Sequence, residues 1–131
     1  MRLVKLQAEQ MELTPAIRAY VEERLLKGLA KLTLNFDDRG TRLSVEVGKT
    51  STHHKKGDYF RAEAHLMIPG HNLRAEAILD DLYASIDAVR DDLKRQLSQL
   101  ESKLRTKQRK GAVKAKRVLK DKGAIAEVSE E

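Results

Sequence analysis

The residues most able to bind a ligand are positively charged side chains that are spaced to share helix faces. In residues 15–33, three of these cations lie at positions i, i+3 and i+7, so one helix face would present all three. Two neighbouring helices of this kind, with a groove between them, would suit the phosphates of a nucleic acid. Acidic residues are interspersed, so an ordinary solvent-exposed surface is the alternative. The cations are Arg18, Arg24, Lys27 and Lys31 in the first segment and Arg90, Lys94 and Arg95 in a second.

Side chains that could catalyse a reaction or hold a metal are not spaced for either task. His53 and His54 are adjacent, so they do not converge on one ion. The aspartate pairs at 37–38 and 91–92 have no partner base, glycine-rich phosphate loop or nucleophile nearby in sequence. We therefore predict a protein that is not an enzyme and that uses no metal or cofactor.

The net charge is concentrated at the C-terminal end. The whole chain has a formal charge of +6. Residues 103–131 contain ten Lys or Arg and four Asp or Glu, so they account for the entire excess. No apolar periodicity continues there, and we expect residues 105–131 to be a tail, basic and then acidic, that is disordered in isolation. The tail cations expected to contact RNA are Lys103, Arg105, Lys107, Arg109 and Lys110.

Four segments alternate apolar and polar residues and predict strands. In the first of them, Val4, Leu6 and Ala8 are expected to face a core. The segments are 2–9, 41–49, 59–69 and 73–77.

Two further segments predict amphipathic helices. Thr14 is expected to cap the first, with Pro15 at its first helical position. Asp80 or Asp81 is expected to cap the second, whose apolar stripe ends at Leu104. The two stripes are Ile17, Val21, Leu25, Leu29 and Leu32, and then Leu82, Ile86, Val89, Leu93, Leu97, Leu100 and Leu104.

The order of elements is therefore β-α-β-β-β-α. A strand-helix-strand crossover should be right-handed and place the first two strands parallel. We predict an α+β fold, a two-layer sandwich in which two helices cover one face of a four-stranded sheet. This domain is expected to span residues 1–104.

Composition narrows the class of protein. The chain has no cysteine, hence no disulfide and no thiolate zinc site. It has no apolar run near the roughly 18–20 residues that cross a bilayer. We expect a cytoplasmic protein with an anionic partner and with no membrane and no small-molecule substrate.

Two stretches carry a resemblance to a known family. "MELTPAIRAYVEERL" and "DDLYASIDAVRDDLKRQLSQLESKL" are similar to the ribosome hibernation-promoting factor and protein Y family, in its short form. The most specific piece is Asp81-x-Tyr83-Ala84-x-Ile86-Asp87, followed by Leu93-x-Arg95-Gln96-Leu97. The resemblance covers about residues 1–104.

The resemblance implies a function in translation. Such proteins bind rRNA and ribosomal proteins of the small subunit, in the channel of the messenger RNA and the A- and P-site tRNAs. They silence idle ribosomes under stress or in stationary phase by steric competition, and the chain is expected to be a monomer off the ribosome. By position, the resemblance carries rRNA contacts to Arg18, Arg24, Lys27, Lys31 and Arg95. It departs from the family at Asp92, where a lysine is usual, and at Lys94, where an acid is common.

Two other functions remain open at this point. A sheet with two helices on one face also occurs in general double-stranded-RNA binders. A basic tail can instead recruit an acidic protein.

Overall fold

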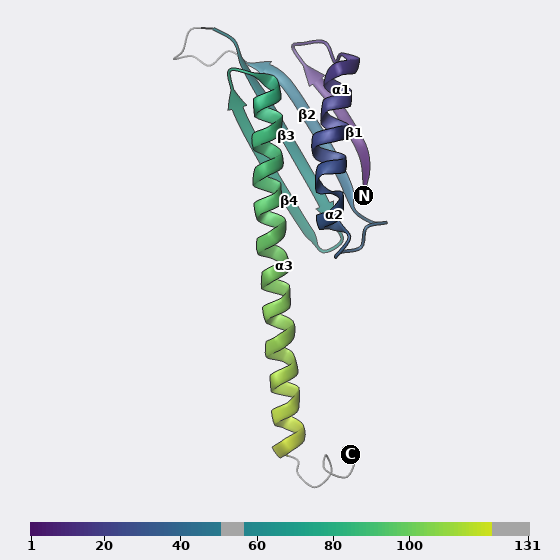
Figure 1. Cartoon of the computed structure of the whole chain (residues 1–131), viewed down its shortest axis with the longest axis vertical. Helices are drawn as coiled ribbons and strands as arrows, with labels where there is room; N and C mark the ends of the chain where they lie inside the picture. Colours follow the sequence, from purple (N-terminus) through teal and green to yellow (C-terminus); the bar gives the residue numbers. More distant parts are fainter. Residues whose placement is uncertain (51–56, 122–131) are drawn as a thin grey trace. The chain divides into compact units, whose positions relative to one another are not determined.

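A four-stranded sheet with helices on one face forms the fold of the chain (Figure 1). The structure, a computed structural model, describes residues 1–50 and 57–121. The chain divides into two units, Met1–Ser98 and a second that begins at Gln99, and the sheet lies in the first. The elements are β1 (Arg2–Glu9), α1 (Pro15–Val21), the π-helix η1 (Glu22–Lys27), α2 (Gly28–Thr33), β2 (Arg42–Thr50), β3 (Tyr59–Ile68), β4 (His71–Leu79) and α3 (Leu82–Asp121).

The strands follow one another across the sheet in the order β1-β2-β3-β4. β1 is parallel to β2, and the other neighbours are antiparallel. The predicted fold class, the order of elements and the parallel first pair are confirmed. The core lies between sheet and helices. Its fully buried members include Leu43, Val45, Val47, Ala62, Ala64 and Leu66 from the sheet, and Val21, Leu25, Leu29, Ile86, Leu93 and Leu97 from the helices.

A bulge in β1 changes which residues of that strand face the core. Leu3 lies opposite Leu43, but the next paired residue is Lys5, opposite Ser44. Val4 is the extra residue, and 45% of its surface is exposed. The prediction that Val4 faces the core is therefore wrong, because an inserted residue shifts the alternation of a strand by one position.

The first helix, formed by α1, η1 and α2, begins as predicted, and its middle part is then a π-helix. The Thr14 hydroxyl accepts a hydrogen bond from the Ile17 amide at 3.1 Å, and Pro15 opens α1. Past Leu29, the buried position is Thr33 and not the expected Leu32. The π-helical turns of η1 explain the difference, because bonding from i to i+5 puts more residues in each turn and favours spacings of four on one face. The Thr33 hydroxyl donates to the Ala30 carbonyl at 3.0 Å.

The second helix, α3, is capped as predicted. The Asp81 carboxylate accepts a hydrogen bond from the Tyr83 amide at 3.2 Å. α3 continues to Asp121, beyond Leu104, where its apolar stripe stops. Residues 105–121 include eight Lys or Arg and two Ala, which are strong helix formers without any burial. That residues 105–131 are disordered off the ribosome stays a prediction.

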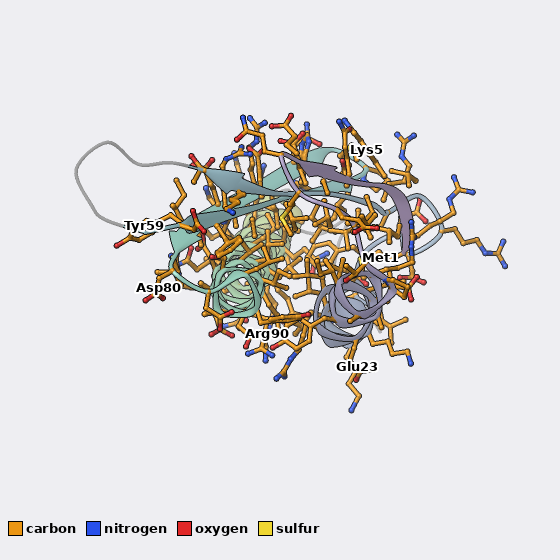
Figure 2. The ribbon with its side chains drawn as sticks, turned by 90° about the horizontal axis from the view of Figure 1, so that it is seen from above. Met1, Lys5, Glu23, Tyr59, Asp80 and Arg90 are labelled. Carbon is orange, nitrogen blue, oxygen red and sulfur yellow. The ribbon has the colours of Figure 1, made fainter. Side chains whose placement is uncertain are left out.

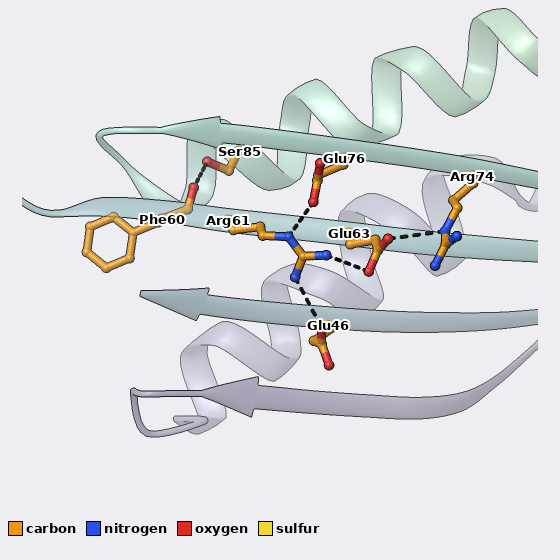
Figure 3. Close-up of polar contacts among 7 residues, drawn as sticks. All are labelled: Glu46, Phe60, Arg61, Glu63, Arg74, Glu76 and Ser85. Atoms are coloured by element: carbon orange, nitrogen blue, oxygen red, sulfur yellow. Dashed lines mark hydrogen bonds and ion pairs between the residues drawn. The ribbon is translucent and has the colours of Figure 1, made fainter. Parts of the chain in front are cut away.

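Hydrogen bonds fix α3 against one edge of the sheet. The buried Ser85 hydroxyl donates to the Phe60 carbonyl at 2.8 Å, as Figure 3 shows, and accepts from the Leu79 amide at 3.1 Å. The Gln96 side chain donates to the Arg74 carbonyl of the outermost strand β4 at 2.8 Å. The helix is thus tied to β3 and β4 by side-chain bonds as well as by apolar packing.

The outer face of the sheet carries an arginine shared by three glutamates (Figure 3). Glu46, Glu63 and Glu76 are register partners across β2, β3 and β4, so three like charges stand in a row. From β3, Arg61 donates to Glu46 at 3.0 Å, to Glu63 at 2.7 Å, and to Glu76 through Nε. Hydrogen bonds to these carboxylates, that to Glu76 first, raise the pKa of Arg61. Adjacent like charges destabilise a sheet, and this guanidinium offsets them.

We expect Arg61→Met to lower the free energy of unfolding by about 1–3 kcal/mol, because the row of carboxylates loses its shared cation. Urea denaturation monitored by circular dichroism measures the loss. Adding Glu63→Gln to this variant should restore part of the stability, since it removes the central charge. Arg42→Met is the matched control, an exposed arginine of β2 with no ion pair in the described part of the chain. Equal losses in Arg61→Met and Arg42→Met would show that the shared arginine adds nothing.

Candidate nucleic-acid interface

The two helices lie side by side on the same face of the sheet (Figure 2). Polar and aromatic side chains join them. The Tyr20 hydroxyl of α1 lies 2.9 Å from both carboxylate oxygens of Asp87 on α3 and donates to that carboxylate. The rings of Tyr20 and Tyr83 meet edge to face, with centroids 4.7 Å apart and planes at 84°. These contacts tie the two helices to each other.

Arg24 joins the same contacts and is not simply a solvent-exposed cation. Its Nε lies 3.4 Å from Asp87, and its guanidinium carbon lies 5.2 Å from the centre of the Tyr20 ring. Tyr20, and then Asp87, raise the pKa of Arg24. We call Tyr20, Arg24, Tyr83 and Asp87 the seam cluster.

Arg90 also lies between the helices (Figure 2). Its aliphatic stem passes over Gly28, where a Cβ would stand 3.5 Å from the Arg90 Cδ. Its guanidinium pairs with Asp91 at 2.9 Å, and only 22% of the side chain is exposed. The groove predicted between two basic ridges is thus crossed by Arg24, Arg90 and the residues they contact.

The remaining predicted cations of the helices fall into two groups. Lys27 pairs with Glu23 at 3.6 Å on an exposed face, and Arg95 pairs with Asp92. A second group consists of exposed residues that form no ion pair within the described residues. That group is Arg18, Lys31 and Lys94. These three are the helix cations best placed to meet the phosphates of a partner.

The predicted tail cations all lie on α3, where their side chains are exposed. Arg105 pairs with Glu101 at 3.2 Å, one helical turn away. On a helix, Lys103, Lys107 and Lys110 share a face because they are spaced by four and three residues. Their contacts with RNA stay a prediction.

Sequence reasoning missed the seam cluster except for Arg24. The resemblance did single out the spacing of Tyr83 and Asp87, and their positions on one helix face could have signalled a joint role. Tyr20 carried no such signal, because its contact with Asp87 depends on how two helices that are far apart in the sequence pack against each other.

The aspartates that could have suggested catalysis have structural contacts. The Asp38 carboxylate pairs with the Met1 ammonium at 2.8 Å, and that ammonium holds the pKa of Asp38 below its ordinary value. The Asp37 carboxylate accepts from the Gly40 amide at 3.2 Å and fixes the loop after α2. Both residues therefore shape the 34–41 connection.

The histidine pair singled out as a poor metal site, His53 and His54, lies outside the described residues. Among the residues that are described, His, Asp and Glu form no group able to hold a metal ion. In the same part of the chain, no helix combines the length and apolarity required to cross a membrane.

Comparison with known proteins finds a matching family and several relatives. A family model described as "Sigma 54 modulation protein / S30EA ribosomal protein" matches residues 4–105. A ribosome hibernation promotion factor of Lactococcus lactis is 33% identical over 128 residues, which cover 96% of this chain and 63% of that protein. A ribosome-associated factor Y of Haemophilus influenzae is 36% identical over 96 residues, covering 73% of this chain and 79% of that protein.

A solved structure agrees with these relatives. The N-terminal domain of Thermus thermophilus protein Y superposes with a TM-score of 0.59 at 33% identity, covering 76% of this chain and 99% of that domain. The chain spans less than two thirds of the length of the Lactococcus relative.

Proposed function

The chain belongs to the Sigma 54 modulation protein / S30EA ribosomal protein family, and we propose that it binds the small ribosomal subunit in the channel of messenger RNA and tRNA and silences idle ribosomes. The resemblance noted in the helix motifs is confirmed. The family consists of ribosome-associated factors and not of enzymes. The proposed place of action is the cytoplasm.

The observation that carries this proposal is the extent of the family match. Residues 4–105 include all but the first two residues of the sheet, the helix formed by α1, η1 and α2, the first part of α3, and the exposed cations Arg18, Lys31 and Lys94. A named hibernation factor is 33% identical across nearly the whole chain. No comparable observation favours a general double-stranded-RNA binder or an adaptor for an acidic protein.

The proposed mechanism is occupation of space and requires no chemistry. The folded unit fills the channel, and cations of the helices meet rRNA phosphates, which release their counterions. Arg18, Lys31 and Lys94 are free of acidic partners in the described part of the chain and would contact phosphate directly. Arg95 would first have to exchange the carboxylate of Asp92 for a phosphate. This exchange makes Arg95 a weaker contact than its position in the family motif implies.

The proposal is tested by co-sedimentation of the chain with purified small subunits in a sucrose gradient. We expect the chain to travel with the subunits and to be displaced by messenger RNA together with tRNA. A translation extract should lose activity as the chain is added. Equal affinity for free duplex RNA, with no displacement by tRNA, would contradict the proposal and favour the general RNA binder.

We also propose that the cations at 103–110 contact RNA. Replacing Lys103, Arg105, Lys107, Arg109 and Lys110 by Gln keeps good helix formers but removes five charges. Each lost phosphate contact lowers the slope of log K against log salt by roughly 0.7–0.9, so we expect the slope to flatten by about four units. Dissociation constants for small subunits, determined at several salt concentrations, give this slope. Truncation after Leu104 should flatten the slope at least as much, and unchanged slopes in both variants would leave the whole affinity to residues 1–104.

A further inference from the structure

The seam cluster combines an anchored arginine with an exposed aromatic ring. The Asp87 carboxylate accepts a hydrogen bond from the Tyr20 hydroxyl and pairs with the Nε of Arg24. A guanidinium has five N–H donors in a planar fork, so the pairing through Nε leaves donors for a further acceptor. The Arg24 side chain is 42% exposed, which lets that acceptor come from solvent.

Tyr83 supplies an aromatic surface in the same cluster, because its ring meets that of Tyr20, over which the Arg24 guanidinium lies. It is 37% exposed, although large apolar side chains of this fold are mostly buried. Its ring is held edge to face by Tyr20, and its backbone amide is bound by Asp81. A ring fixed in this way loses little conformational freedom when a planar group stacks on it. Two of the three tyrosines of the chain thus meet at a point where a guanidinium is also held.

An unpaired ribonucleotide matches this combination. Its phosphate is an acceptor for the Arg24 fork, and its base offers a planar face to Tyr83. A base within a duplex is already stacked on both sides, so stacking on a side chain selects loops, bulges and single strands. An acidic peptide would satisfy Arg24 but would leave the exposed ring without a partner.

We propose that the seam cluster is a binding site for one unpaired RNA nucleotide, with the base on Tyr83 and the phosphate on Arg24. Tyr20 and Asp87 are positioning residues, because they fix the ring and the guanidinium and do not themselves meet the RNA. This inference rests on the proposed function, which supplies an RNA partner, and adds to it a contact that distinguishes unpaired bases from duplex.

A short single-stranded oligoribonucleotide that carries one 2-aminopurine tests the site, because stacking on an aromatic ring quenches the fluorescence of that base. The wild-type chain should quench it, and Tyr83→Phe should quench equally. Tyr83→Leu should lose the quenching and bind small subunits about tenfold more weakly. Arg24→Lys keeps the charge but not the fork, and it should bind RNA severalfold more weakly. The same quenching by Tyr83→Leu as by the wild type would overturn the proposal.

Two further measurements keep the result decisive. Circular dichroism shows whether Tyr83→Leu is folded, and photocrosslinking of a 4-thiouridine oligoribonucleotide to the wild-type chain maps the contact without any substitution. Crosslinks that exclude η1 and the start of α3 would overturn the site. A polyglutamate peptide that displaces the RNA as well as unlabelled RNA does would also overturn it, in favour of an acidic protein.

Failure of the site and failure of the proposed function can be told apart. If wild-type chain co-sediments with small subunits and Tyr83→Leu does so equally well, the seam cluster is not a contact but the function stands. If the wild-type chain does not co-sediment, the function fails, and the oligoribonucleotide result decides the site alone.

Discussion

Replacing Leu93 by aspartate should unfold the sheet-and-helix unit of the chain. Leu93 is fully buried at the centre of the stripe that α3 packs on the sheet. The substitution removes a leucine side chain from the core, which costs about 2–5 kcal/mol, and places a charge there without a partner, which costs several more. A domain of this size is stable by roughly 5–15 kcal/mol, so the sum consumes most or all of that margin.

Thermal denaturation monitored by circular dichroism measures this effect. Ser98→Asp is the matched control, because it adds the same charge to the same helix at an exposed position. The control should melt like the wild type, while Leu93→Asp should show no cooperative transition. A native-like melting curve for Leu93→Asp would mean that α3 is not packed on the sheet at this residue.

Reversing Arg18, Lys31 and Lys94, helix cations that form no ion pair within the described residues, should weaken binding to small subunits by about two to three orders of magnitude near 0.1 M salt. The variant is Arg18→Glu, Lys31→Glu and Lys94→Glu combined. Each substitution removes one phosphate contact, which is worth about one power of ten in affinity at this salt. Each new glutamate also repels the phosphates. Arg24 is left unchanged, because its reversal would break the seam cluster and confuse binding with folding.

The control reverses as many charges on the other face of the sheet. Arg2, Lys5 and Arg42 are exposed, and Lys5 lies on the side away from the helices in Figure 2. Arg2 and Arg42 are register partners, so reversing both creates no new opposite pair. Pelleting with small subunits should be nearly unaffected by this control. An equal loss from both triple variants would show that total charge, and not the helix face, determines binding.

The sequence predicts the elements of this fold well, because each is encoded by local spacing. Alternation in β2 and β3 and the four- and three-residue steps from Leu82 to Leu97 identify buried faces without knowledge of the neighbours. The Thr14 cap and Pro15 likewise need only adjacent residues. Errors arise where one inserted residue changes the period, as at Val4 in β1 and in the π-helical turns that bury Thr33 in place of Leu32.

The site was less predictable than the fold. Sequence spacing identifies which cations share a helix face, but not which of them meet a carboxylate from another helix. Arg24 and Arg90 look alike in sequence, yet one is held by Asp87 on the other helix and the other by its own neighbour Asp91. Apolar spacing does not mark the end of α3, because the stripe stops at Leu104 and the residues that continue the helix to Asp121 are helix formers that need no burial.

The bulge at Val4 also affects how the chain behaves when many copies are present. β1 and β4 are the two outermost strands, and an open strand edge is a template for aggregation with other molecules. The bulge interrupts the regular hydrogen-bonding ladder of β1 and adds local twist. On β4, the Gln96 side chain donates a hydrogen bond to one backbone carbonyl, that of Arg74. Both edges are thereby poor templates for growth of a continuous sheet.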